Sequence, residues 1–450
     1  MTAARVPAVG GTRDVLAPDD VARDYLLLGL RLDQHLPGTV DGYFGPAELK
    51  ARVDMEPLRP PARLAEEAVA LRSRLVAEVP EPDRRHWLDL QLVAAETQAR
   101  VWAGESISYL DQVERCLTLR PERRDDATFE QAAAALDALL PGQGTVAERL
   151  KAEDDAWTVP TDRVRAVVEA LVVRFRGRAS SLYALPDGEA LRVSLVRGQP
   201  WSGYNWYDGG YRSRVDINLD LPIRLPNLVA TVAHETYPGH HLEHAEKERR
   251  LVEELGRLES SILLINAPEC LISEGLANLG VGIAARAEEL PGLLAELAVI
   301  GGLAMAHDEA ALREAVDRQA GIAAQRAILG EARVNAALML HVDGEARVRV
   351  ADYMVEVGRS SPETAAKRLE FMTHPLWRLY DFVYTEGEAM LRRWLEVVPP
   401  AERDARFGRL LTESLTPPAI RAETSAALTA TGSSRGEAPT GRQPLDSGRV

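Results

Sequence analysis

Four of the nine histidines of this 450-residue chain gather between His234 and His244. Glu235 follows the first of them directly. Neutral imidazole is the commonest protein ligand for zinc, and a glutamate beside a ligand histidine can serve as a general base. The segment therefore predicts the centre of a metal-dependent hydrolase, in which His234 binds the ion and Glu235 accepts a proton from water.

The spacing of these histidines departs from the His-Glu-x-x-His pattern, which places two imidazoles one turn apart on one helix face. Pro238 occupies the position where that pattern has its second histidine. On a regular helix, His240 would point about 120° away from His234, and His241 would lie about 10 Å further along the axis. A kink or π-bulge at Pro238 and Gly239 could correct this geometry. We expect either His240 or His241 to be the second ligand and the other to bind substrate or support a ligand.

A third ligand is expected from Glu274, which stands in the apolar run Cys270-Leu-Ile-Ser-Glu-Gly-Leu-Ala277. A buried carboxylate needs a partner, and a metal ion is one. With two imidazoles, Glu274 would complete a site for one Zn²⁺ per chain and leave one position open for water. By contrast, we expect Glu243 and His244 to lie on a solvated helix face.

The composition restricts the class of protein. A hydrophobic fraction of 46% and a charged fraction of 27% are typical of globular proteins. The net charge of −15 argues against a nucleic-acid or anionic-membrane partner. There are only two cysteines and no apolar signal or membrane-spanning segment, so we expect a cytoplasmic protein. Nothing in the sequence specifies an oligomeric state.

The elements that must position these residues are mostly helical. We expect a loose leader over 1–20, a helical wall subdomain over 21–185, a catalytic region over 186–420 and a disordered tail over 421–450. Residues 191–196 and 213–219 alternate as strands do, with an aromatic turn between them. The predicted fold class is therefore mainly α with a small antiparallel β-sheet. Asn218 is a candidate substrate contact, because an extended peptide could add to its strand.

Two motifs resemble those of a known family. The run His234-Glu-Thr-Tyr-Pro-Gly-His-His241 resembles the His-Glu-x-x-Pro-Gly-His-His signature of the bacterial family called domain of unknown function 885. Ser273-Glu-Gly-Leu-Ala277 is similar to that family's Glu-Gly-Trp-Ala segment, with Leu276 in place of tryptophan. The similarity covers roughly residues 200–395 and, more weakly, the loop 40–46.

Later segments extend the resemblance. Residues 333–341 resemble the family's Arg-…-Asp-…-His stretch, although Asn335 and Ala337 stand where an aspartate is common. Tyr384-Thr-Glu-Gly387 resembles its late Tyr-x-x-Gly element without the preceding Pro-Gly-Gln. The resemblance implies a helical metallopeptidase-like fold, similar to gluzincins such as carboxypeptidase Taq, with a small sheet beside a deep active-site cleft.

The resemblance and the residue chemistry together suggest donors and a specificity residue. His341 and Tyr384 are candidates to donate hydrogen bonds to the tetrahedral oxyanion. Arg393, later in the same helical segment as Tyr384, is a candidate to bind a substrate carboxylate.

The predicted function is zinc-dependent hydrolysis of short peptides by a metal-activated water. A hydrolase of non-peptide amides or esters could use the same site. A catalytically inactive binding protein of the same fold is a further alternative, which the presence of His234, Glu235 and Glu274 disfavours.

Overall fold

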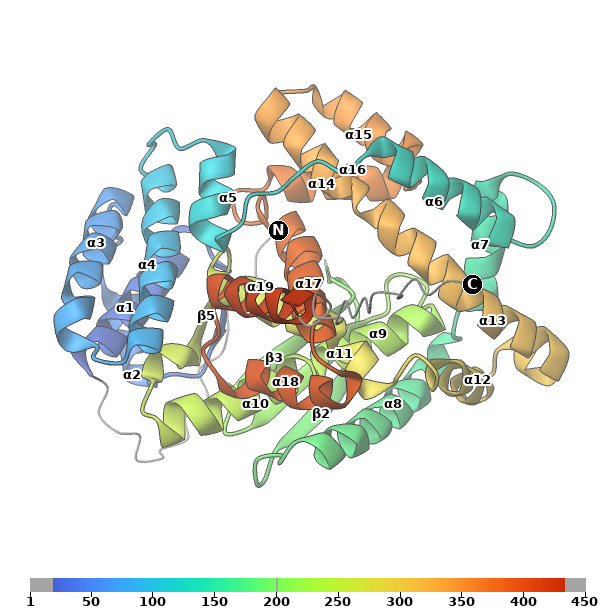
Figure 1. The fold of residues 1–450 in the computed structure, drawn as a ribbon, viewed down its shortest axis with the longest axis horizontal. Helices are drawn as coiled ribbons and strands as arrows, with labels where there is room; N and C mark the ends of the chain where they lie inside the picture. Colours follow the sequence, from blue (N-terminus) through green and yellow to red (C-terminus); the bar gives the residue numbers. More distant parts are fainter. Residues whose placement is uncertain (1–18, 200, 434–450) are drawn as a thin grey trace, which may run out of the picture.

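The computed structural model describes residues 19–199 and 201–433, and in these ranges the fold is mainly α, as the sequence predicts (Figure 1). The first half of the chain forms α1 (Asp20–His35), α2 (Ala47–Met55), α3 (Pro61–Glu78), α4 (Pro82–Trp102), α5 (Tyr109–Leu117), α6 (Asp126–Leu139), α7 (Val146–Ala156) and α8 (Thr161–Leu182). Local signals set several of these boundaries. The Asp19 side chain accepts a hydrogen bond from the first turn of α1, and a capping box of Thr145 and Glu148 begins α7.

The second half carries the predicted metal ligands. Its helices are α9 (Leu225–Glu235), α10 (His240–Lys247), α11 (Pro268–Ala284), α12 (Leu290–Ile300), α13 (Glu309–Gly330), α14 (Ala332–Leu338), α15 (Arg347–Glu356), α16 (Pro362–Thr373), α17 (Tyr380–Glu396), α18 (Pro400–Thr412) and α19 (Pro417–Ser433). Single π-helical segments follow α10 and α14, at Glu248–Glu254 and Met339–Asp343, and short 3₁₀ turns occur at Leu258–Ser261 and Ala304–His307.

Two small sheets accompany the helices. β1 (Val40–Tyr43) pairs antiparallel with β5 (Ile262–Leu264). β2 (Ala190–Val196), β3 (Gly203–Gly209) and β4 (Arg212–Asn218) form a second sheet in the order β2-β4-β3. The predicted antiparallel pairing of the first and last of these strands is wrong: β2 and β4 run parallel, because the aromatic segment is itself a strand that reverses the chain between them.

β4 is the central strand of this sheet and has no free edge. β2 occupies one side of it and β3 the other. Asn218 at its end donates from Nδ2 to the carbonyl oxygens of Gln199 and Trp201, each at 2.9 Å. An added peptide strand would need the backbone groups that these neighbours already use, so the predicted substrate role of β4 and Asn218 is wrong.

α11 and α17 lie between two large hydrophobic cores, near the middle of the molecule in Figure 1. The first core joins α1–α5 to β5 and to the beginnings of α11 and α17. The second joins α8, α9 and α12 to the later turns of α11 and α17. The two helices touch where Gly275 faces Gly387, and a Cβ on Gly275 would lie 2.6 Å from the Gly387 backbone. This close packing holds Glu274, the neighbour of Gly275, between the cores.

Two of the predicted segment boundaries need correction. α8 packs into the same core as α9 and α11, so the boundary at 185 does not separate the cores. α19 is helical to Ser433, although a disordered tail was expected from residue 421. Its Glu423 accepts hydrogen bonds from Trp394 Nε1 at 2.9 Å and from Arg409, which fixes the helix on α17 and α18. The rest of the expected tail, and the leader up to residue 18, lie outside the described residues.

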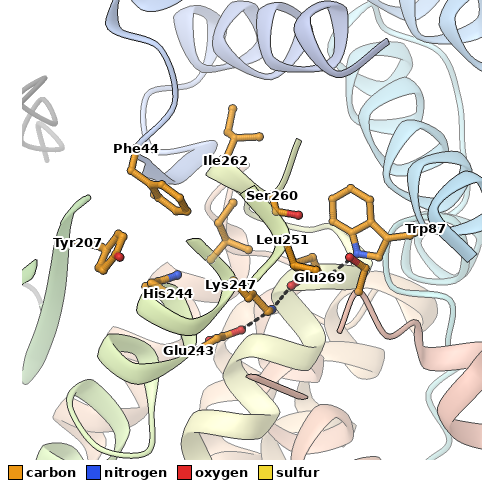
Figure 2. A pocket seen from close by; sticks show the side chains of 13 residues that line it. Phe44, Trp87, Tyr207, Glu243, His244, Lys247, Leu251, Ser260, Ile262 and Glu269 are labelled. Carbon is orange, nitrogen blue, oxygen red and sulfur yellow. Dashed lines mark hydrogen bonds and ion pairs between the residues drawn. The ribbon is translucent and has the colours of Figure 1, made fainter. Parts of the chain in front are cut away.

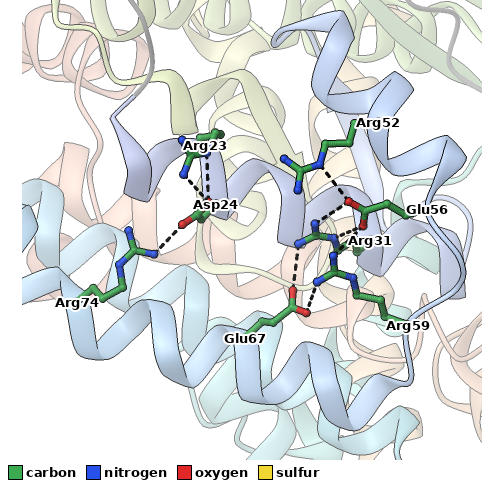
Figure 3. Close-up of polar contacts among 8 residues, drawn as sticks. All are labelled: Arg23, Asp24, Arg31, Arg52, Glu56, Arg59, Glu67 and Arg74. Atoms are coloured by element: carbon green, nitrogen blue, oxygen red, sulfur yellow. Dashed lines mark hydrogen bonds and ion pairs between the residues drawn. The ribbon is translucent and has the colours of Figure 1, made fainter.

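A cluster of ion pairs joins α1 to α2 and α3 on the surface of the first core (Figure 3). Arg31 of α1 binds Glu56 with two parallel hydrogen bonds of 2.8 and 3.0 Å and reaches Glu67 at 3.1 Å. Arg59 binds both of the same carboxylates. The hydrogen bond from Arg31, helped by the charges of Arg31, Arg59 and Arg52, lowers the pKa of Glu56 to about 2 against the opposing effect of burial.

None of the helices in residues 19–433 that the structure describes combines the length and the apolar character that crossing a bilayer requires.

Candidate metal centre

The helix is interrupted between the first histidine of the motif, His234, and the second, His240. α9 ends at Glu235, and α10 begins anew at His240 after a cis peptide bond between Tyr237 and Pro238. Gly239 lies so close to the end of α9 that a Cβ there would collide with the carbonyl oxygen of His234. This arrangement replaces the expected kink or π-bulge with two separate helices, and it removes the constraint of helical spacing between His234 and the later histidines.

The break brings His240 back against His234, and α11 supplies the third side chain. The two Nε2 atoms lie 3.1 Å apart. Glu274 places Oε2 at 3.4 Å from His234 Nε2 and Oε1 at 3.8 Å from His240 Nε2. One ligand atom from each of the three residues lies within 4.8 Å of the others, a spacing that a single ion bound at about 2 Å from each ligand requires.

The outer nitrogens of both rings are occupied, which orients the inner ones. His234 Nδ1 lies 3.1 Å from Asn278 Oδ1. His240 Nδ1 lies 3.4 Å from Glu243 Oε2 and 3.4 Å from Ser273 Oγ. A ring that donates its Nδ1 proton to these oxygens keeps the lone pair on Nε2, which is the form that binds a metal.

Glu274 completes the fit between this cluster and a cation. Its Oε1 accepts a hydrogen bond of 2.6 Å from the hydroxyl of Tyr380 on α17. Its Oε2 is buried and has no hydrogen-bond partner within the described chain. An orphaned carboxylate oxygen beside two imidazole lone pairs is costly to bury unless a positive charge sits among them. The residues therefore suit a divalent metal ion such as zinc.

The charges around His240 agree with this conclusion. Burial lowers the pKa of His240, but the hydrogen bond to Glu243 and the charges of Glu274 and Glu235 outweigh it and raise the pKa to about 10. The pocket therefore attracts positive charge, as a proton or as a metal ion.

His241 has a different role from His240. It is fully buried, with Nδ1 at 2.8 Å from Ser213 Oγ on β4 and Nε2 at 3.0 Å from Glu189 Oε2. The same Glu189 oxygen accepts a hydrogen bond of 2.5 Å from the hydroxyl of Tyr237. Because both ring nitrogens are used in this network, His241 joins α10 to the three-stranded sheet, and His240 is the histidine left as the candidate second ligand.

A buried row of charges, formed by Glu243, Lys247 and Glu269, lies on the Nδ1 side of the His240 ring. Glu243 is 1% exposed, so the expectation of a solvated face is wrong for this residue. Its Oε2 accepts from Ser273 Oγ at 2.6 Å, and its Oε1 accepts from Lys247 Nζ at 2.7 Å. Lys247 also binds Glu269, so two carboxylates share one ammonium (Figure 2). The row fixes the Glu243 carboxylate, which in turn orients His240.

A pocket opens beside this row, and Glu243, Lys247 and Glu269 are part of its wall (Figure 2). Phe44 and Tyr207 line it together with His244, whose ring lies 5.3 Å from that of Tyr207. Burial lowers the pKa of His244 to about 3, so its ring is neutral at pH 7. The expected solvated position of His244 is therefore also wrong: it is a half-buried part of an aromatic wall.

Glu235 lies beside the ligand cluster and against β3. A Cβ on Gly203 of β3 would lie 3.2 Å from Glu235 Cγ, so only glycine leaves room for this side chain. Asn205 of the same strand donates to the Glu235 carbonyl oxygen at 2.7 Å and ties the end of α9 to the sheet. The carboxylate makes no side-chain hydrogen bond to another described residue, so it can accept a proton. Burial raises its pKa, together with the charges of Glu274 and Asp41.

Three side chains that the motif analysis did not single out border the cluster. Asp41 of β1 accepts a hydrogen bond of 2.7 Å from the hydroxyl of Tyr204 on β3. Burial raises the pKa of Asp41, and the charge of Glu274 adds to this effect. Tyr380 binds Glu274 directly. The only sequence signal for Asp41 was the weak similarity of the loop 40–46, and Tyr204 and Tyr380 looked like ordinary core aromatics.

Tyr384 lies near the cluster. Its ring packs edge-on against Tyr380 at 5.0 Å. Burial raises the pKa of its phenol well above the usual range, and the charges of Glu274 and Glu235 add to the shift. The backbone carbonyl of Tyr384 also accepts a hydrogen bond from Asn278, the partner of His234.

The structure does not bring His341 to the ligand cluster. Its ring stacks on Tyr109 at 4.2 Å, and its Nε2 lies 2.9 Å from the carbonyl oxygen of Met372. Tyr109 belongs to the first core, and Met372 belongs to a separate cluster formed by α14, α15 and α16. The geometry therefore argues against His341 as the oxyanion donor.

Arg393 is likewise separate from the cluster. It is exposed on α17, nine residues after Tyr384. At about 100° per residue, nine residues place a side chain on the opposite helix face. Arg393 therefore cannot reach a substrate that contacts Tyr384.

Comparison with known proteins adds no function. No family model matches the chain, and no curated protein matches its sequence. Among solved structures, a protein from Colwellia psychrerythraea described as a "putative lipoprotein" matches 82% of this chain and 74% of its own, with 14% identity and a TM-score of 0.47. A similarly described protein of unknown function from Shewanella oneidensis matches 91% of this chain and 73% of its own, with 11% identity and a TM-score of 0.40. Similarities this low support neither a fold-family assignment nor a function.

Proposed function

We propose that this protein is a zinc-dependent hydrolase that cleaves amide bonds in short peptides. The observation that carries the proposal is the convergence of His234 Nε2, His240 Nε2 and the Glu274 carboxylate, with all ligand atoms within 4.8 Å of one another and Glu235 beside them. Three protein ligands and one open position are typical of catalytic zinc sites, whereas structural zinc sites use four protein ligands.

His234, His240 and Glu274 would hold the ion. When bound, zinc supplies Lewis acidity, which polarises the scissile carbonyl and makes a water molecule easier to deprotonate. The supporting contacts of Asn278 and Glu243 keep the two imidazoles in the orientation that binding needs.

The remaining steps belong to the chain's own residues. Glu235 has a carboxylate without a side-chain partner among the described residues, so it can take the proton from the attacking water and return it to the leaving amine. Tyr384 can donate a hydrogen bond to the substrate oxygen as negative charge develops there. Tyr380 holds Glu274 at 2.6 Å and prevents it from rotating away from the histidines.

The resemblance of residues 234–241 and 273–277 to the domain of unknown function 885 family, and through it to gluzincin peptidases, supports the same conclusion. It stays a prediction, because no family model matches the chain. Glu235 directly after a ligand histidine is the feature that the resemblance and the geometry share.

Metal content is the first test. The purified wild type should carry about one zinc ion per chain by mass spectrometry, and Glu274→Ala should lose it. Glu288→Ala, which changes an exposed glutamate in the turn that follows the same helix, is the control and should keep the metal. A wild type that takes up no zinc, even when zinc is added back after chelation, would exclude the proposed site.

Turnover is the second test. A library of short peptides should be cleaved by the wild type, and Glu235→Gln should keep its zinc but lose activity by several orders of magnitude. Full activity in Glu235→Gln would remove this residue as the base. Hydrolysis of non-peptide amides or esters with no cleavage of peptides would keep the mechanism and change the substrate class.

A further inference from the structure

Two half-buried arginines beside α17 make no ion pair or hydrogen bond within the described residues, although the charge of the buried Asp381 acts on both. Arg333 of α14 and Arg368 of α16 line the same pocket, together with Ser360. Within residues 19–433 that the structure describes, neither guanidinium forms an ion pair or a hydrogen bond, and Arg333 Nε is fully buried. Arg31, by contrast, is 6% exposed and is paired with Glu56 at 2.8 Å. Because an unpaired buried charge is costly, this pocket points to an anionic ligand.

The pocket adjoins the metal centre through Tyr384. The Arg333 guanidinium lies 5.7 Å from the centre of the Tyr384 ring. That ring lies 5.0 Å from the ring of Tyr380, whose hydroxyl binds Glu274 at 2.6 Å. The two sites are therefore separated by two aromatic rings and at most about 16 Å, a distance that about five residues of extended peptide can span at about 3.3 Å per residue.

The charge of the pocket specifies the kind of anion. Asp381 of α17 is 4% exposed, and its Oδ2 has no hydrogen-bond partner within the described chain. Burial raises the pKa of Asp381, while the charges of Arg333 and Arg368 oppose the shift, which places all three groups in one electrostatic unit. Two guanidinium groups and one carboxylate leave a net charge of +1. That charge matches a monoanion such as a carboxylate better than a phosphate dianion.

We propose that Arg333 and Arg368 bind the free carboxylate of a peptide substrate. Combined with the proposed hydrolase function, on which this second step rests, the pocket makes the protein selective for peptides cleaved near their carboxyl end. Water adds across the C–N bond, the acyl group keeps the oxygen, the released amine takes the proton, and the released piece carries the carboxylate held by the arginines. In this proposal, Arg333 and Arg368 bind the substrate carboxylate, for which the sequence suggested Arg393.

Binding to a catalytically inactive chain tests the pocket without requiring turnover. Glu235→Gln protein is titrated by calorimetry with an N-acetyl dipeptide that has a free carboxyl end and with the same dipeptide as its C-terminal amide. We expect the acid to bind about ten to a hundred times more tightly than the amide, since hydrogen bonds to a charged group are worth this much. Equal binding of acid and amide overturns the proposal, and this comparison needs no change in the arginines.

Variants then assign the effect to residues. In the Glu235→Gln background, Arg333→Met and Arg368→Met should each lose most of the preference for the acid, and Arg393→Met is the matched control that should retain it. If either methionine variant does not fold, Arg333→Lys and Arg368→Lys replace it and should reduce the preference, because lysine keeps the charge but not the forked geometry. A preference that survives all of these changes overturns the assignment.

A third ligand distinguishes the two sources of a carboxylate. A dipeptide amide with glutamate at its second position carries a side-chain carboxylate and no free end. If it binds as tightly as the free acid, with the same dependence on Arg333 and Arg368, the pocket binds acidic side chains. If it binds no better than the amide, the pocket is specific for the carboxyl end of the chain. Carboxylate binding without hydrolysis of any peptide would support the carboxylate site and refute the peptidase function.

Discussion

The row of charges behind His240 allows a quantitative prediction. Glu243→Gln keeps the size of the side chain and removes its charge. The carboxylate now lies 3.4 Å from His240 Nδ1 and accepts from Ser273 Oγ at 2.6 Å and from Lys247 Nζ at 2.7 Å. After the substitution, Lys247 still has Glu269 as a partner. The main loss is therefore the charged acceptor for the His240 ring, whose Nε2 becomes a weaker and less well oriented metal ligand.

Loss of such a supporting carboxylate lowers metal affinity by about tenfold to a hundredfold, or roughly 1.4 to 2.7 kcal/mol. The zinc dissociation constant, measured at pH 7 by competition with a chromophoric chelator, should rise by this factor. Glu246→Gln is the matched control: Glu246 lies on the same helix and is 2% exposed, but it pairs with Arg249 and not with a ligand histidine. A folded Glu243→Gln protein that binds zinc within twofold of the wild type, or an equal loss in Glu246→Gln, would refute this reasoning.

Three further predictions concern separate parts of the structure. His240→Gln should lose zinc, whereas His241→Gln should keep zinc but unfold in denaturant with a free energy lower by about 3 kcal/mol, because it breaks a buried network; the opposite pattern would reverse the assignment of the ligand. Gly203→Ala should keep zinc but reduce kcat by about tenfold or more, since its Cβ would lie 2.6 Å from Thr231 Cγ2 and 3.2 Å from Glu235 Cγ and would displace α9 together with the base; an unchanged kcat would refute this. Glu56→Gln should lower the free energy of unfolding at pH 7 by about 2 kcal/mol. Because the pKa of Glu56 is about 2 in the folded chain and 4.5 normally, the contribution of its carboxylate is complete above pH 4.5 and is lost as the pH falls towards 2, so wild type and variant should converge there in acid denaturation.

The composition of the candidate metal centre could be proposed from the sequence because its residue types are rare and their chemistry is narrow. His234, Glu235 and Glu274 could be named from the sequence, since few functions other than metal binding favour a carboxylate in an apolar run near a histidine cluster. Residue types that serve many purposes were harder to assign. Arg333 and Arg368 resemble any helical arginines in the sequence, and only their half-buried positions in one pocket distinguish them from the exposed Arg393.

The helical class of the fold was predictable for a similar reason. Apolar residues recur with the period of a helix along most of the chain, and burial of one face follows from that period. Strand pairing could not be predicted in this way, because a period of two shows which residues alternate but not which strands become neighbours. The parallel pairing of β2 with β4 depends on where the intervening aromatic strand lies, and that is a long-range contact.

The sequence by itself determined the helical class of this protein, the approximate place of its candidate metal centre and the types of side chain that could hold a metal, since these follow from local periodicity and residue chemistry. The tertiary structure decided which histidine faces His234, because the break at Pro238 and Gly239 ends one helix and starts another in a direction that no helical spacing specifies. It also decided which polar groups are buried without partners, and burial depends on residues far away in the chain.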